Sequence, residues 1–501
     1  MNKLRYILLL SLLLCSAAAG AQTYEQVVRR SFWNASQNIA GIRQDSLSRS
    51  YAEAFGKYEG GEFRDSWQPE QSWSAGAATA SIRHMENMSL KGSFSFTQTE
   101  GYDMCGSMFV NPGYYPVDVL EFTPGRKTLQ TYTFDGGISY DLTKIWRIGA
   151  MMDFESANIA KRKDLRHSNW LLDMTVAPGF MYHRGDWAFG ASYIYRKTSE
   201  SVEATQIGVS ESSYYAFLDK GLMYGVYNIW TGSGLYLDEA GVKGFPVKEI
   251  TNGFALQTQY KGFFAEAEYR HTSGMIGEKE YIWFLFPGNS ADLHLGYRHD
   301  GEKAQHYARL NFGWKDRTMD EAVLEKVTEG GVSTVVNHGQ NQIQSERSWN
   351  MAPEYEYVTR RLELLAKAQV GVRQEVASQM YPYLHWRSLM TYDVNVRVRY
   401  YLGNFVVAGH MGYGAGKVKE DSWLADAQAG VQTAPFRLQE YYDWKMEYAS
   451  AQRLNAGLSL RWNFWRGLYA EASGRLSHAF NLIYIKGNDR TEACIKLGYN
   501  F

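Results

Sequence analysis

The sequence predicts an all-β fold, a closed transmembrane antiparallel β-barrel of about 18 strands, with 14 or 16 strands as alternatives. Three observations support this prediction. The chain starts with a stretch typical of an export leader, long segments alternate between apolar and polar residues, and tight turns alternate with long connections.

Residues 1–21 have the pattern of a cleavable export signal. Lys3 and Arg5 are followed by an almost unbroken aliphatic run over 7–14 and then by small residues up to Ala21. This is the order that a leader peptidase recognises. A membrane anchor helix is the alternative, but the apolar run is about half of the roughly 20 residues that a span needs. We predict cleavage after Ala21.

The composition favours a membrane protein and excludes several partners. Aromatic residues make up 15% of the chain, with 36 Tyr and 15 Trp, and both residue types concentrate where a membrane meets water. Removing Lys3 and Arg5 with the leader leaves a formal charge of −3, so no nucleic-acid partner is expected. After the leader, no run approaches 18 apolar residues, which excludes a helical membrane protein.

The strongest signal is alternation with a period of two residues. Within 392–400 every even position is apolar and most odd positions are polar or charged, and the same alternation recurs over 146–155, 291–298, 454–464 and 468–476. This period places one set of side chains on each face of a strand. The strands are longer than the usual five or six residues. A large soluble sandwich is the alternative.

The connections between these strands alternate in length. Tight turns are predicted at His84–Asn87, Asp141–Ile145, Arg184–Asp186, Lys261–Gly262, Asp300–Lys303, Arg360–Arg361, Gly403–Asn404 and Trp465–Gly467. Longer irregular connections are predicted over 101–128, 202–248, 272–288, 318–343 and 420–449. Short periplasmic turns and long extracellular loops are typical of outer-membrane barrels. The barrel is therefore expected over residues 50–501.

The last strand has two predicted roles, to close the barrel and to carry an assembly signal. Because lipid offers no hydrogen bonds, the strands must close into a barrel without a free edge. Leu497, Tyr499 and Phe501 alternate with polar residues up to the chain end. This resembles the C-terminal signal of outer-membrane barrels of Gram-negative bacteria, although Lys496 stands where a glycine is common. The resemblance implies that the barrel assembly machinery and the outer-membrane lipid are partners.

Residues 22–49 precede the first strand and behave differently. Apolar residues between 24 and 32 fall at helical spacing, and Asn38-Ile39-Ala40 follows. The latter resembles the Asn-Pro-Ala element of the hatch in the long-chain fatty-acid transporter family, with Ile39 in place of proline. The resemblance implies a segment that plugs the lumen, with Asn38 and Ala40 as hatch residues. A periplasmic helix packed against the barrel mouth is the alternative.

Charged residues of both signs fall on the polar faces of the strands. In hydrocarbon each basic group near the midplane would cost about 2–4 kcal/mol, so these faces must line the lumen. One interpretation is a conduit whose wall selects solutes, and the other is a lattice of salt bridges that stiffens the wall. At this strand number, side chains alone cannot fill the interior. The lumen-lining candidates are Arg147, Asp153, Glu266, Glu268, Arg270, Asp292, His294, Arg298, Asp393, Arg397, Arg399, Arg461, Glu471 and Arg475.

Three aromatic segments in the predicted connections, 104–115, 214–236 and 281–286, suggest a further role. They could capture a hydrophobic ligand or dock a surface protein partner, because exposed apolar patches usually mean contact. They could equally fold over one another.

Two functional hypotheses therefore remain. The first is a channel or facilitator for a small or hydrophobic solute. The second is a non-transporting surface or scaffold protein whose aromatic loops bind a partner. No enzyme activity is expected, since His306 on an outward face lies beside no recognisable nucleophile motif. No cofactor and no metal site are expected. A TonB-dependent transporter is disfavoured, because far fewer residues precede the first strand than its plug would need.

Overall fold

The computed structural model describes residues 23–44, 47–205, 215–229, 244–278, 281–380, 383–422 and 438–501. The predicted leader, residues 1–21, lies outside this range. The helices are α2 (Tyr24–Arg30), η1 (Trp33–Ala35), η2 (Ile39–Gln44) and α4 (Leu438–Ser450). None of the helices in these ranges is long and apolar enough to cross a membrane.

Strands make up most of the chain. In order they are β1 (Arg49–Gly60), β2 (Gln71–His84), β3 (Met88–Ser107), β4 (Asp118–Asp141), β5 (Trp146–Lys161), β6 (Arg166–Arg184), β7 (Trp187–Thr205), β8 (Tyr215–Asp219), β9 (Gly225–Ile229), β10 (Phe245–Tyr260), β11 (Phe263–Glu278), β12 (Tyr281–Asp300), β13 (Gln305–Glu329), β14 (Val332–Val358), β15 (Leu362–Met380), β16 (Tyr383–Leu402), β17 (Phe405–Ser422), β18 (Arg453–Trp465), β19 (Leu468–Ala479) and β20 (Asp489–Asn500).

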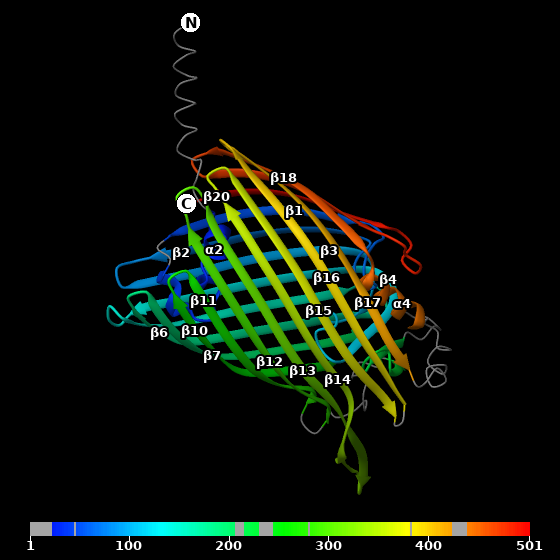
Figure 1. Ribbon diagram of the computed structural model, residues 1–501. Helices are drawn as coiled ribbons and strands as arrows, with labels where there is room; N and C mark the ends of the chain where they lie inside the picture. The colour runs from blue at the N-terminus through cyan, green and yellow to red at the C-terminus, as the bar shows by residue number, and fades with distance from the viewer. Residues whose placement is uncertain are drawn as a thin grey trace, which may run out of the picture.

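Eighteen of these strands form one closed antiparallel barrel (Figure 1), as predicted. Each strand pairs with its neighbour in sequence, except that β7 pairs directly with β10. The hairpin β8–β9 is not part of the barrel wall, and its strand β8 pairs with β4. The barrel closes where β20 pairs with β1, and the backbones of Ser50 and Phe501 exchange two hydrogen bonds there. Closure leaves no sheet edge at membrane depth.

The two faces of the wall differ as the alternation predicts. On β16, Val394, Val396 and Val398 are 39–49% exposed on the outer face. Arg397 and Arg399 alternate with them and point into the lumen. Large aromatic and aliphatic side chains cover the outer face of the other strands in the same way. This is the sidedness of a barrel whose outside meets lipid.

All eight predicted tight turns are present and lie at one end of the barrel, which we call the tight-turn end. By the rule for outer-membrane barrels this end faces the periplasm. The predicted connections at the other end need correction. In the range 272–288, β11 continues to Glu278 and β12 begins at Tyr281, and in the range 318–343 β13 and β14 form a hairpin. The strands β3 and β4 likewise extend into 101–128.

Residues 23–44, which we call the inner segment, lie inside the barrel at the tight-turn end, where Figure 1 shows α2 behind the front strands. The helix predicted from the apolar spacing is α2. The segment contacts Ser139 on β4, Gln257 on β10 and Glu363 on β15. Because these strands lie on different sides of the barrel, the inner segment spans the lumen.

The opposite mouth is spanned by a second assembly, which we call the cap. It comprises residues 108–117, the hairpin β8–β9, α4 and the inward side chains of the strand ends around them. Phe217 of β8 packs with Tyr441 of α4, and α4 packs against β16 and β17. Tyr224, in the turn of this hairpin, packs against Ala377 of β15. The cap therefore connects β4 to the opposite wall.

Candidate functional site

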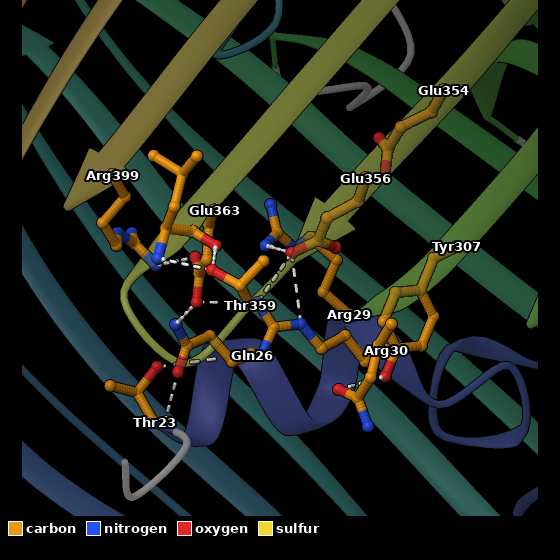
Figure 2. Close-up of polar contacts among 12 residues, drawn as sticks. Thr23, Gln26, Arg29, Arg30, Tyr307, Glu354, Glu356, Thr359, Glu363 and Arg399 are labelled. Carbon is orange, nitrogen blue, oxygen red and sulfur yellow. Dashed lines mark hydrogen bonds and ion pairs between the residues drawn. The ribbon is translucent and has the colours of Figure 1, made fainter. Parts of the chain in front are cut away.

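The inner segment is held by buried ion pairs, drawn in Figure 2. Arg30 contacts Glu356 at 2.8 Å and Glu363 at 2.7 Å, and its side chain is 4% exposed. Burial lowers the pKa of Arg30, but the carboxylates of Glu363 and Glu356 outweigh it and raise the pKa. Arg29 pairs with Glu356 at 2.5 Å, and Arg399 pairs with Glu363 at 3.1 Å. We call these five residues the latch.

Gln26 ties the start of α2 to the latch. With Thr23 it forms a capping box, an arrangement that satisfies free backbone N–H groups at a helix start. The Gln26 amide nitrogen also donates to Glu363 at 2.5 Å and to the Tyr401 hydroxyl at 2.6 Å. One residue therefore both starts the helix and fixes it to β15 and β16.

Farther along the inner segment, Asn38 is fully buried against β6, β7 and β10. Its amide nitrogen donates to the carbonyl oxygens of Phe180 and Ala191 at 2.8 and 3.2 Å and to Gln257 Oε1 at 3.0 Å. Its side-chain oxygen accepts from the Ala40 backbone N–H at 3.1 Å. Both predicted hatch residues thus lie at the contact between the inner segment and the wall.

Glycines on the inward face of the wall make room for this contact. A Cβ added at Gly179 or Gly190 would lie 2.5 or 2.6 Å from a side-chain atom of Asn38. A Cβ at three other wall glycines would also collide with the inner segment. At Gly137 and Gly149 it would meet Ile39, and at Gly296 it would meet Phe32. Glycine within a strand often marks a close approach of another chain segment. The wall is shaped to fit the inner segment.

Between the inner segment and the cap lies a polar cavity of about 350 Å³, which we call the chamber. Gln37 of the inner segment and Tyr114 of the cap both border it. The Tyr114 hydroxyl donates to Glu249 at 2.9 Å and accepts from Arg196 at 2.9 Å, and its backbone carbonyl accepts from Arg317 at 2.8 Å. Tyr114 is therefore fixed above the chamber by three strands.

The chamber gathers a subset of the predicted lumen residues, namely Glu268, Arg270, Asp292 and His294. Glu268 and Arg270 pair with each other, and His294 Nδ1 lies 2.8 Å from Asn311 Oδ1. Glu266 lies nearby on β11 and accepts a hydrogen bond from Ser36 of the inner segment. These residues belong to neighbouring strands, β11 and β12, whose ladder brings them together.

The other predicted residues lie elsewhere on the wall. Near the tight-turn end, Arg147 pairs with Asp141 and Arg298 with Asp300, and Asp153 lies opposite Asp135 in the β4–β5 ladder. On the remaining wall, Asn395 donates to Asp393, and Arg461 stacks on Tyr469 with 3.5 Å to the ring centroid. Glu471 lies between Arg461 and Lys496 in the ladder. The remaining predicted lumen residues on this part of the wall are Arg397, Arg399 and Arg475.

The C-terminal residues Leu497, Tyr499 and Phe501 are exposed on the outer face, with the rings of Tyr499 and Phe501 stacked 5.7 Å apart. Their role as an assembly signal remains a prediction. His306, considered above as a possible catalytic residue, lies 2.8 Å from the Tyr355 hydroxyl on an exposed surface.

Several chamber residues were not among the predicted ones. Arg196 and Glu249 alternate with outward residues on β7 and β10, so the same period could have identified them. Lys315 and Arg317 lie on β13, whose alternation is interrupted by the charged Asp316 on the outward face. No sequence signal marks Tyr114, because its place depends on how the cap folds.

The comparisons with known proteins place the chain in a family. No curated protein matches it. Among solved structures, a mutant of the ferric enterobactin receptor (PfeA) from Pseudomonas aeruginosa aligns at TM-score 0.41 and 10% identity, covering 91% of this chain and 80% of the receptor. The "Copper transporter OprC" aligns at 0.40 and 9%, covering 91% and 83%. OccAB4 from Acinetobacter baumannii aligns at 0.34 and 9%, covering 91% and 97%.

These scores are too low to say what the chain binds or moves. A family model gives the firmer result, since it matches residues 39–501, which include η2 and the whole barrel. The chain therefore belongs to the family described as "Family of unknown function (DUF6850)".

Proposed function

We propose that the protein is a gated outer-membrane channel for a small solute. In this proposal the inner segment closes the periplasmic end of the lumen and the cap closes the other end. The observation that carries it is the fit of the inner segment, which is held across the lumen by the latch and by inward glycines next to a polar chamber. A wall built to receive a separate segment suits a gate that can leave.

The chamber favours a polar solute over a hydrophobic one. Charged and hydrogen-bonding side chains line most of it, and an apolar molecule entering it would leave these groups without partners. The comparisons give no support to the resemblance to long-chain fatty-acid transporters. A small polar solute is therefore the proposed cargo.

The alternative, a scaffold with partner-binding aromatic loops, has less support. Phe109, Tyr115, Trp283, Phe284 and Phe286 belong to two of the three aromatic segments and are at most 4% exposed. They form the core of the cap, so they are not available to a surface partner. Much of the third segment, 214–236, lies outside the described residues.

Export and domain organisation remain part of the proposal. Residues 1–21 act as a leader, 22–49 act as the gate and 50–501 form the barrel, with Leu497, Tyr499 and Phe501 as the assembly signal. Amino-terminal sequencing of protein extracted from the outer membrane should begin at Gln22. A protein that still carries Met1, or one recovered from the soluble periplasm, contradicts this part.

Gating can be tested with a thiol reporter in the chamber. Cys105 and Cys494 are first replaced by Ser, and Ser290→Cys places a thiol beside Lys315. In the Gly179→Ala/Gly190→Ala variant the new methyl groups displace Asn38. Overpacking costs roughly 1–3 kcal/mol per site, so the segment should open about tenfold more often or more. A charged, membrane-impermeant thiol reagent should then modify the reporter at least tenfold faster.

The matched control is Gly371→Ala. Gly371 faces the lumen on β15, and a Cβ there meets Thr391 and wall backbone but nothing of the inner segment. This variant should label at the parent rate. Equal rates in all three proteins would show that the inner segment does not control access, and the gate would have to be abandoned.

A further inference from the structure

Two charged side chains of the chamber stand without a partner. Asp292 on β12 and Lys315 on β13 both border the cavity. Within the described part of the chain, neither forms a hydrogen bond or an ion pair. The Lys315 nitrogen lies over the Tyr114 ring, 5.9 Å from the ring centroid. A partly buried charge without a partner raises the free energy of the folded protein. Binding of a ligand group of opposite charge would therefore be favourable.

The three arginines that border the chamber, by contrast, are neutralised. Arg196 forms a two-pronged pair with Asp173, Arg317 pairs with Glu346 at 2.5 Å, and Arg270 pairs with Glu268. Among the described residues that border the chamber, Lys315 is thus the cation that forms neither an ion pair nor a hydrogen bond. Among the chamber's carboxylates, Glu268 is paired and Glu249 already accepts from Tyr114, which leaves Asp292.

The register of β12 and β13 sets the spacing of the two free charges. Asp292 lies opposite Gly313, and Lys315 lies opposite Ser290, so the two side chains occupy a diagonal pair on the inward face. Diagonal neighbours in an antiparallel ladder are about 7–8 Å apart. They are not within ion-pair distance of each other. Gly313 lies opposite Asp292, and the Asp292 carboxylate and the Asn350 amide reach over it, so a small molecule would bind on the cavity side of these groups.

We propose that the chamber binds a small zwitterion, with the ammonium group of the solute at Asp292 and its carboxylate at Lys315. The inference deepens the proposed channel function and rests on it for the route of entry. A simple anion would place its charge beside Asp292 and Glu249, and a simple cation would meet Lys315. A solute that carries both charges satisfies the two groups together.

The test is equilibrium dialysis of the full-length protein in detergent against radiolabelled L-alanine, with acetate and methylammonium as single-charge probes. It is run in the Gly179→Ala/Gly190→Ala background, in which the Ser290→Cys reporter independently reports access. Alanine should be retained at one site, and neither single-charge probe should be. Lys315→Met and Asp292→Asn should each weaken retention at least tenfold, whereas Lys315→Arg should preserve most of it.

The controls are Lys144→Met and Asp186→Asn, which remove charges of the same kinds from tight turns far from the chamber. Both should retain alanine as the parent does. A heat-modifiable gel shift reports that each variant folds as a barrel. If the reporter reacts quickly but alanine is not retained, or if acetate or methylammonium is retained equally, the zwitterion site is refuted while the gate stands. If the reporter stays protected, the gate fails instead, and retention is then read on the unmodified protein after prolonged incubation, where its absence also refutes the site.

Discussion

At the scale of residues, the latch joins the inner segment to the wall through buried charges. Arg30, Glu356 and Glu363 are each at most 6% exposed at the side chain. A buried ion pair contributes little compared with well-packed apolar residues, but losing one partner is costly because the other charge remains buried. Because Arg30 pairs with both carboxylates, its loss should weaken the latch most.

Removing the cation of the latch should release the inner segment. In Arg30→Met, Glu356 keeps Arg29 and Glu363 keeps Arg399, but both carboxylates lose their shared partner, which should cost about 3 kcal/mol, the low end for breaking a buried ion pair. Trypsin should then cleave the folded barrel after Arg29 or Arg43 at least a hundredfold faster. Arg30→Met/Glu363→Gln removes the buried carboxylate that has lost its shorter ion pair, so it should recover part of the protection.

Arg83→Met serves as the control for that experiment, since Arg83 is exposed on β2 near the same end. Its cleavage should match that of the parent. If Arg30→Met is as resistant to trypsin as Arg83→Met, the latch does not hold the segment.

Residue positions could be predicted from the sequence further than residue partners. The period-two pattern assigned Arg399 and Glu266 to the lumen, because which face a strand residue occupies is a local property. Arg399 is linked to Arg30 of the inner segment because both pair with Glu363, and Glu266 accepts a hydrogen bond from Ser36. These residues of the inner segment are distant in sequence from the strands that they contact. Such pairings depend on how the segment enters the barrel, and no periodicity encodes that.

At the scale of elements, the turns were predictable and the ends of strands were not. Most of the tight turns interrupt the alternation with Gly, Asp or Arg, and all eight were placed correctly. The range 281–286 lacks alternation because residues of both phases, Trp283 and Phe284, are buried in the cap. Strands covered on both faces become continuous apolar runs. The missed β13–β14 hairpin carries Gly330–Gly331, both with positive φ, a pair typical of tight hairpin turns.

The outer part of the β13–β14 hairpin should be dispensable. Residues 327–329 pair with 332–334, and most of these positions are exposed. Leu324 and Val335, nearer the barrel, pack against the cap. Deleting 327–329 and 332–334 while keeping the Gly330–Gly331 turn should change the free energy of unfolding by less than about 0.5 kcal/mol, as for other surface changes.

Thermal unfolding followed by the heat-modifiable gel shift measures this effect. The reporter at Ser290→Cys should also stay protected in the shortened protein. A marked loss of stability, or a labelled reporter, would mean that the hairpin helps to close the lumen.

At the scale of the whole molecule, two closures stand in series. The inner segment spans one end of the lumen and the cap spans the other, with the chamber between them. A solute that crosses must pass both. Opening one closure should expose the chamber to one side of the membrane without creating a continuous pore.

The cap can be opened by a cavity in its core. Trp283 is 1% exposed and stacks on Phe245 at 5.7 Å, and truncating a buried aromatic residue to Ala costs about 3–5 kcal/mol. In planar bilayers, Trp283→Ala and Gly179→Ala/Gly190→Ala should each conduct little more than the parent protein. The triple variant should show a steady conductance much larger than the sum of the two.

Phe254→Ala, on the lipid face, is the control in both backgrounds. A triple variant that folds but stays silent would mean that the barrel is not a conduit. Full conductance from either opening alone would mean that the lumen has a single gate.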